Sequence, residues 1–347
     1  MEATQWVKLP IAFVSPAEVL AAGIVLPLVC LGMVATHFYL RITQGNKIGL
    51  DDWCILLGVI FIAGMGATFI VGEHMGIMGY PTPVPSGTVA TEAFGLYLDA
   101  YTQTAKLEFA IQVLLDFAYL FVKTSIVLFC RRIFIANRGS FFDWASRITL
   151  VIIFMWSLGF LLALIVGCGK DVAIHWAPLK LAASGCDLST PEVAVVISDI
   201  ILDIIIIVLP LPAIWALNMS VKRRLAVTGV FLVGLGSLAA SGARAAVYLT
   251  VLYAGYGAGY DVDQAVTLLL WWSLLEVSLA AIAACLPSMS TLAKVESVRS
   301  FFYRLGSMTS LSSRWRSQKS DLSNTDIEKR IDTTSDSNHI SPTNSYR

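Results

Sequence analysis

The stretch of residues 53–71, WCILLGVIFIAGMGATFIV, runs for nineteen residues without a charged side chain. A helix needs about 20 mostly apolar residues to cross the hydrocarbon core of a bilayer, so this segment is suited to span a membrane. Six further segments are comparably long and mostly apolar: 19–40, 107–130, 148–168, 193–217, 225–252 and 265–286. The sequence therefore predicts an all-α, polytopic membrane protein built as a seven-transmembrane-helix bundle.

The composition of the whole chain supports a membrane protein. Of its 347 residues, 56% are hydrophobic and 14% are charged, and the mean hydropathy is +0.73. An ordinary soluble domain has about 25% charged residues. A soluble fold of this size could not bury so much apolar surface, which excludes a cytoplasmic enzyme, a nucleic-acid-binding protein and a disordered scaffold. We expect a multi-pass protein of the plasma membrane or an endomembrane, with the lipid bilayer as its first partner.

The basic residues outside the spans predict the orientation. Eighteen Lys and Arg residues lie on the side that carries the C-terminal tail, and three lie on the other side. Because cytoplasmic segments are enriched in Lys and Arg, the N-terminus is predicted outside and the C-terminus in the cytosol. The basic inner loops are then a candidate contact for a cytosolic signalling partner.

The chain divides into four predicted parts. Residues 1–18 form a short extracellular N-terminus, and residues 19–287 form the transmembrane domain. In 288–305, apolar residues recur every three to four positions among basic ones, which is typical of an amphipathic helix on the membrane surface. Residues 306–347 are rich in Ser and Thr and poor in apolar residues, which predicts a disordered cytosolic tail.

Two of the six cysteines favour a disulfide bond. Cys168 and Cys186 flank the predicted external connection between the fourth and fifth spans. The exterior of a cell is oxidising, so the compartment favours a Cys168–Cys186 bridge. The other four cysteines lie in or at the ends of spans, where we expect small apolar packing. No cysteine or histidine spacing suggests a metal site.

Ionisable residues within the predicted spans are the main functional signal, because each is costly in hydrocarbon and needs a partner or water. Helical periodicity places Gln112, Asp116 and Lys123 on one face of the third span and places Asp199 and Asp203 on one face of the fifth. The sequence predicts a ligand cavity in the outer half of the bundle, with Arg244 facing carboxylates. The predicted cavity residues are Gln112, Asp116, Asp199, Asp203, Arg244 and Glu276.

The same residues also fit a purely structural network of buried ion pairs that fixes the helix register. Such a network would need about equal numbers of acids and bases. Here four acids accompany two bases, Lys123 and Arg244. The surplus acids favour a bound cation, protonated carboxyls, water or a ligand.

Several short motifs together resemble a known family. They are Leu50-Asp51-Asp52-Trp53, Lys123-Thr124-Ser125 followed by Arg131-Arg132, Ser198-Asp199 followed by LPLPAIWALNM at 209–219, Ser241 with Arg244, and Trp272 with Glu276 ahead of Cys285-Leu286-Pro287. This set resembles the fungal rhodopsin-like seven-helix family, which includes membrane proteins of satratoxin-type secondary-metabolite clusters and Pth11-like receptors. The short exterior N-terminus has no cysteine, unlike the external cysteine-rich domain of many Pth11-like receptors, and this favours the cluster-associated branch.

The resemblance implies a receptor-like or accessory component of a secondary-metabolite biosynthetic gene cluster that binds a small lipophilic molecule. The alternative is a cofactor-free intramembrane enzyme, a cyclase or isomerase, with Asp116, Asp199, Asp203 and Glu276 as candidate acids and bases. Neither an Asp-rich diphosphate motif nor a histidine box is present. A transporter ranks last, because we find no convincing inverted repeat.

Despite the family name, the sequence predicts no covalent retinal. A retinal protein of the microbial or animal kind needs a Schiff-base lysine in the seventh span, and residues 265–286 contain none. Lys294 lies beyond Pro287, and Lys123 lies in the third span. We expect no cofactor and no metal.

Overall fold

The computed structural model describes residues 12–45, 47–81, 99–134, 141–169, 172–176, 189–212, 221–254 and 261–289. These residues form helices and contain no strand. The elements are α1 (Pro16–Thr43), α2 (Leu50–His74), α4 (Asp99–Phe134), α5 (Phe141–Val166), the short 3-10 helix η1 (Val172–Trp176), α7 (Ser189–Val208), α9 (Val221–Ala254) and α10 (Val262–Met289). Each predicted span overlaps one of the seven long helices, so the all-α fold class is confirmed.

Six of these helices are long and apolar enough to cross a membrane: α1, α2, α4, α5, α9 and α10. The exception within the described residues is α7, because its 20 residues include Glu192, Asp199 and Asp203. This helix nevertheless contacts α4, α5 and α9 inside the same bundle. Its acids therefore face protein, where partners can offset the cost of burying charge.

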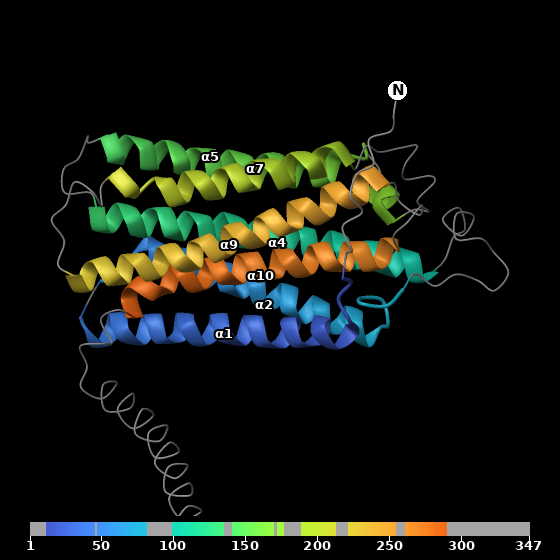
Figure 1. Ribbon diagram of the computed structural model, residues 1–347, viewed down its shortest axis with the longest axis horizontal. Coiled ribbons are helices and arrows are strands. Elements are labelled where there is room, and N and C mark those ends of the chain that lie inside the picture. The colour runs from blue at the N-terminus through green and yellow to red at the C-terminus, as the bar shows by residue number, and fades with distance from the viewer. Residues whose placement is uncertain are drawn as a thin grey trace, which may run out of the picture. The chain divides into compact units, whose positions relative to one another are not determined.

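The long helices run side by side, with α4 and α10 in the middle of the bundle (Figure 1). Helix α4 contacts α2, α5, α7 and α10, whereas α10 contacts α1, α2, α4 and α9. The largest apolar core lies among α1, α2, α4 and α10 and includes Val59, Ile62, Val122 and Leu274. This arrangement leaves the charged faces of α4, α7, α9 and α10 directed toward one another.

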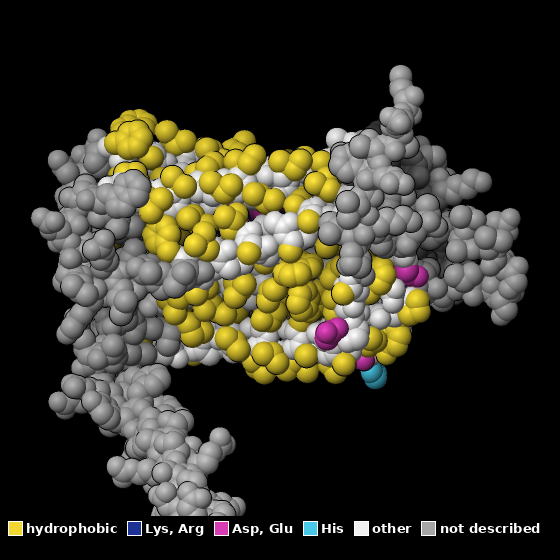
Figure 2. Space-filling view, viewed as in Figure 1, with side chains coloured by type: hydrophobic (Ala, Val, Ile, Leu, Met, Phe, Trp, Pro, Cys, Tyr) yellow, Lys and Arg dark blue, Asp and Glu magenta, His cyan; other side chains and the backbone are white. Residues whose placement is uncertain are grey.

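The outward-facing side chains are largely apolar. On α5, Val151, Phe154 and Met155 are each more than half exposed. Figure 2 shows hydrophobic side chains over most of the described part of the face in view, with only a few acidic ones near one end. An apolar belt of this kind suits lipid tails rather than water.

The helix ends differ from the predicted spans in two respects. Helix α7 ends at Val208, inside the predicted span 193–217, and the last residues of that span, 213–217, lie outside the described residues. Pro210 and Pro212 explain the early stop, because proline has no N–H to donate and its ring clashes with the preceding turn. Basic residues assigned to connections belong to helices instead: Arg41 lies in the last turn of α1, and Arg131 and Arg132 lie in the last turn of α4.

Several predicted segments lie outside the described residues. They are most of the N-terminus (1–11), the main part of the predicted interfacial helix (290–305) and the tail (306–347). Helix α10 itself continues to Met289, slightly past the predicted domain end at 287.

Candidate functional site

A buried charge network joins four helices in the middle of the bundle. Its centre is Asp199 on α7, whose carboxylate is fully buried. Arg244 of α9 donates from Nη2 to Asp199 Oδ2 at 2.6 Å, and Lys123 Nζ of α4 lies 2.9 Å from Asp199 Oδ1. One carboxylate thus pairs with two cations on two different helices, through a hydrogen bond from Arg244 and an ion pair with Lys123, which ties α4, α7 and α9 together.

The network continues from these three residues to both sides. Lys123 also forms an ion pair with Asp203, and Ser241 Oγ donates to the second Asp203 oxygen at 3.0 Å. On the other side, Arg244 Nε lies 3.3 Å from Glu276 Oε2, which is an ion-pair distance without hydrogen-bond geometry. Three acids therefore share two bases, and Glu276 is the least satisfied of the acids.

The carboxylates of Asp199, Asp203 and Glu276 approach one another closely enough to consider a cation. One oxygen from each lies within 4.8 Å of the others. However, Lys123 and Arg244 already occupy this space and offset two of the three negative charges, and a metal ion would have to displace one of these cations. The donor set therefore suits an ion-pair network better than a metal site.

Tyr119 of α4 covers the network. Lys123 Nζ lies 5.0 Å from its ring centroid, and the Arg244 guanidinium carbon lies 5.7 Å away. These distances are in the range of cation–π contacts, which strengthen when water is excluded. The Tyr119 side chain is buried, and its hydroxyl has no hydrogen-bond partner among the described residues.

A cavity of about 240 Å³ lies next to the network. It is bounded by the N-terminal halves of α4, α7 and α10, by the C-terminal halves of α5 and α9, and by η1. All of these parts belong to the half of the bundle that the charge distribution predicts to be the outer one. The polar lining residues are Glu108, Gln112, Asp116, Tyr119, His175, Glu192, Arg244 and Ser273.

The structure divides the sequence-predicted site residues into two groups. Gln112, Asp116 and Arg244 line the cavity. Asp199, Asp203 and Glu276 do not line it and instead form the ion network. Arg244 belongs to both groups, so it is the physical link between cavity and network.

Asp116 stands apart from the charged network. It accepts a hydrogen bond from Ser157 Oγ of α5 at 2.7 Å through Oδ2. The sequence left open whether Arg244 pairs with Asp116 or Asp199, and the contact is with Asp199. No cation among the described residues forms an ion pair with Asp116, and its second oxygen is available to the cavity.

Five of these polar lining residues were missed by sequence reasoning: Glu108, Tyr119, His175, Glu192 and Ser273. Glu108 could have been found, because it lies four and eight residues before Gln112 and Asp116 and hence on nearly the same helix face. Glu192 falls one residue before the predicted fifth span. His175 lies in η1, with its ring centroid 5.2 Å from that of Phe109.

Only one of the two cysteines in the predicted disulfide, Cys168, lies among the described residues. Cys168 is disulfide-bonded, and the thiols of Cys30, Cys54, Cys130 and Cys285 are free. The predicted partner Cys186 lies outside the described residues, so the Cys168–Cys186 pairing stays a prediction. Cys168 Sγ also lies 3.6 Å from His175 Nε2, which places it beside the cavity wall.

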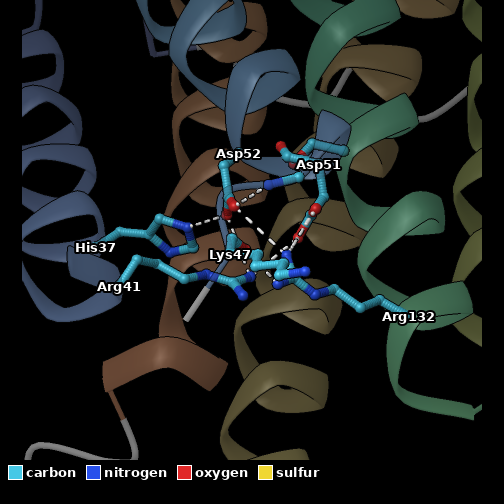
Figure 3. A network of polar contacts seen from close by, with 8 residues as sticks. His37, Arg41, Lys47, Asp51, Asp52 and Arg132 are labelled. Carbon is cyan, nitrogen blue, oxygen red and sulfur yellow. Dashed lines mark hydrogen bonds and ion pairs between the residues drawn. The ribbon is translucent and has the colours of Figure 1, made fainter. Parts of the chain in front are cut away.

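A second polar cluster lies at the other end of the bundle, where α1 and α4 end and α2 begins (Figure 3). His37 Nε2 lies 2.6 Å from Asp52 Oδ1, and Arg41 Nη2 lies 3.0 Å from Asp51 Oδ2. Arg132 of α4 reaches Asp51 at 3.1 Å. Asp52 also accepts the backbone N–H of Gly49 at 2.8 Å, which caps α2.

This second cluster connects motifs that lie far apart in the sequence. Asp51 and Asp52 belong to the Leu50–Trp53 motif, and Arg132 belongs to the basic pair at the end of α4. The cluster was not predicted, because Arg41 falls one residue beyond the predicted first span (19–40), yet its side chain is only 9% exposed. Each charged side chain of this second cluster has an ion-pair partner. We therefore interpret the cluster as a structural link that holds α1, α2 and α4 together.

Together, the helical bundle, its apolar exterior and its buried charges define a multi-pass membrane protein with an internal cavity. The family model of the fungal rhodopsin domain matches residues 36–295, and the chain belongs to that family.

Two curated relatives share this region. The chain is 27% identical over 270 residues to the polyenoic acids biosynthesis gene cluster protein Ba17b of Metarhizium anisopliae, an alignment that covers 73% of this chain and 67% of the relative. It is 28% identical over 183 residues to the fugralins biosynthesis cluster protein 2 of Gibberella zeae, covering 52% of this chain and 44% of the relative. The second alignment therefore spans less than half of that relative.

Proposed function

We propose that this protein is a receptor-like or accessory component of a secondary-metabolite biosynthetic gene cluster and that it binds a small lipophilic molecule in the cavity beside Arg244. The family match and the two cluster-encoded relatives support the biological setting. The cavity is the single observation that carries the binding role.

The lining of the cavity suits such a ligand. Its walls include the aromatic side chains of Phe109, Trp156 and Phe160, and its inner end carries Tyr119 and Arg244. Ligand sites are typically apolar hollows with a few well-placed polar groups that fix orientation. A lipophilic molecule could contact the aromatic wall while its polar end reaches the residues above the ion network.

The position of the network suggests how occupancy could be transmitted. Arg244 lines the cavity and also holds Asp199 of α7 and Glu276 of α10. A ligand that moves Arg244 would change contacts among α4, α7, α9 and α10. At the opposite end, Arg147 is 56% exposed and is a candidate contact for a cytosolic partner.

A cofactor-free intramembrane enzyme is the second candidate, and one observation favours it. Asp116 faces the cavity with one oxygen not used by Ser157. It is therefore a better candidate acid or base than Asp199, Asp203 or Glu276, which are engaged by Lys123 and Arg244. No observation favours a transporter.

The residues do not fit a covalently bound retinal. Helix α10 contains no lysine, and Lys123 of α4 is engaged by Asp199 and Asp203 beneath Tyr119. We therefore expect no visible absorbance band when retinal is added to the purified protein. A band that hydroxylamine bleaches would contradict this expectation.

Gene deletion with joint metabolite and transcript profiling tests the proposed function. A receptor-like role predicts lower transcript levels across the neighbouring biosynthetic genes. Accumulation of one intermediate with unchanged transcripts would instead support the enzyme. Unchanged metabolites and unchanged transcripts would contradict both roles.

A further inference from the structure

The cavity contains more negative than positive groups. Glu108 and Glu192 line it, and among the described residues neither carboxylate has a hydrogen-bond or ion-pair partner. Asp116 adds a third carboxylate with a single hydrogen bond, from Ser157. Glu108 and Glu192 are half-buried and Asp116 is buried. Carboxylates withdrawn from water are costly without a charge partner, so this arrangement favours a ligand that supplies positive charge.

Arg244 does not balance these acids. Its guanidinium is held by Asp199 at 2.6 Å and by Glu276 at 3.3 Å, and its side chain is only 5% exposed. The positive charge of Arg244 is therefore paired with the acids of the ion network. The network itself holds three acids against two bases, so it contributes no surplus positive charge to the cavity.

A second observation points independently to a ligand. The hydroxyl of Tyr119 belongs to a side chain that is only 3% exposed, and it has no hydrogen-bond partner among the described residues. Tyr119 also lines the cavity. A buried hydroxyl without a partner loses the hydrogen bonds that it makes in water, and a polar group in the cavity would restore one.

The aromatic side chains that line the cavity also favour a ligand with both an apolar part and a positive charge. Phe109, Trp156 and Phe160 line the same space as the three carboxylates. Trp156 is fixed in place, because its indole N–H donates to Ser198 Oγ at 2.8 Å. Aromatic faces attract cations as well as apolar groups, so they complement the acids.

We propose that the cavity selects a compact lipophilic amine in its protonated form, an inference that rests on the proposed binding role. The ammonium group lies among Glu108, Asp116 and Glu192, and the apolar body packs against Phe109, Trp156 and Phe160. A free carboxylic acid is excluded, because it would add a fourth negative group to the same space.

Three probes of matched shape test this selection: 2-(2-naphthyl)ethylamine, 2-(2-naphthyl)ethanol and 2-naphthylacetate. Binding to the full-length protein in uncharged lipid nanodiscs is measured by isothermal titration calorimetry, with empty nanodiscs as the blank. The amine should bind roughly tenfold or more tightly than the alcohol, since hydrogen bonds to charged groups are the stronger ones. The acetate should not bind.

Isosteric variants locate the bound amine. Glu108→Gln and Asp116→Asn should each weaken amine binding roughly tenfold while changing alcohol binding little. Glu192→Gln provides a third variant if one of these fails to fold. Glu73→Gln on α2, which does not line the cavity, is the matched control and should bind the amine like the wild type.

Ala163→Phe, which projects a larger side chain into the cavity, separates the two proposals. If the alcohol or the acetate binds as tightly as the amine and Ala163→Phe abolishes that binding, the cavity binds ligands but the charge selection is wrong. If amine binding is equal in Glu108→Gln, Asp116→Asn and the wild type, the selection is likewise wrong. Failure of all three probes to bind at millimolar concentration contradicts both proposals.

Discussion

Arg244 connects the cavity with the buried ion network. It comes from α9, lines the cavity, and contacts acids on α7 and α10. Its side chain is 5% exposed, so water cannot replace a lost partner. Removing one member of such a network leaves the others buried and unsatisfied, which is more costly than the net contribution of the pair.

Arg244→Leu should therefore destabilise the protein strongly. We expect a loss of about 3–5 kcal/mol, because Glu276 would lose its only ion-pair contact among the described residues. The melting temperature and folded yield in detergent measure this effect. Arg147→Leu is the matched control: that side chain is 56% exposed, and its pair contributes about 0–1 kcal/mol. Equal melting temperatures for the two variants would show that the buried network contributes little.

Single-residue roles were only partly predictable. The directions of Asp116, Asp199 and Arg244 followed from helical periodicity and from the cost of charge in lipid. The choice of partner did not, because it depends on the relative heights of α4, α7 and α9, which no local pattern encodes. Arg41 is a further example: it falls just beyond the predicted first span, yet it lies buried against Asp51, and no local pattern encodes that contact.

The close approach of α1 and α2 depends on glycine. A Cβ placed on Gly66 of α2 would lie 2.5 Å from the Gly23 carbonyl oxygen and 2.5 Å from Pro27 Cγ, both on α1. Small residues at such contacts let helix backbones pack closely in membranes. The two helices would have to separate to admit a methyl group.

Gly66→Ala should consequently lower the melting temperature, with a cost of about 1–3 kcal/mol from overpacking. The control is Gly159→Ala on α5, where an added Cβ would meet no atom within 4 Å. That substitution should be neutral or slightly stabilising, because alanine favours a helix over glycine. An unchanged melting temperature for Gly66→Ala would indicate that α1 and α2 are not packed this closely.

The connection after α5 carries the predicted bridge. We expect mass spectrometry of non-reduced peptides to recover Cys168 linked to Cys186, because this segment is predicted to face an oxidising exterior. Cys54, a free thiol on α2, provides the internal control and should be alkylated after unfolding without reduction. Recovery of both Cys168 and Cys186 as alkylated thiols would refute the bridge.

Whole elements were more predictable than their ends. Seven apolar segments gave seven long helices in the described residues, since the length needed to cross a bilayer is a strong constraint. Their ends were less certain, because helices extend into water beyond the bilayer. Thus α4 begins at Asp99, eight residues before the predicted span, and α7 ends early at its proline pair.

At the scale of the whole molecule, the orientation remains to be measured. The excess of basic residues on one side predicts an external N-terminus and a cytosolic C-terminus. Epitope tags at each end, probed with antibodies in intact and in permeabilised cells, test this prediction. The N-terminal tag should be accessible in intact cells and the C-terminal tag only after permeabilisation. The reverse pattern would also place the cavity in the cytosolic half.

The cavity could be predicted only in outline. Charged faces on several helices indicated polar space in the outer half, but its shape depends on how five helices and η1 pack. The sequence predicted six residues to line one cavity. In the packed bundle, Asp199, Asp203 and Glu276 instead belong to the ion network, which Arg244 connects to the cavity. Glu108 and Glu192 join Asp116 as the acids that line the cavity.

The proposed function requires that a molecule bound in this cavity is needed for the protein to act in its pathway. The most direct measurement is complementation of a deletion strain with Ala163→Phe, which fills the cavity, and with Leu162→Phe, whose side chain faces outward and is 51% exposed. With both variants expressed at the wild-type level in the membrane, Leu162→Phe should restore the metabolite profile and Ala163→Phe should not. Full restoration by Ala163→Phe would contradict the account.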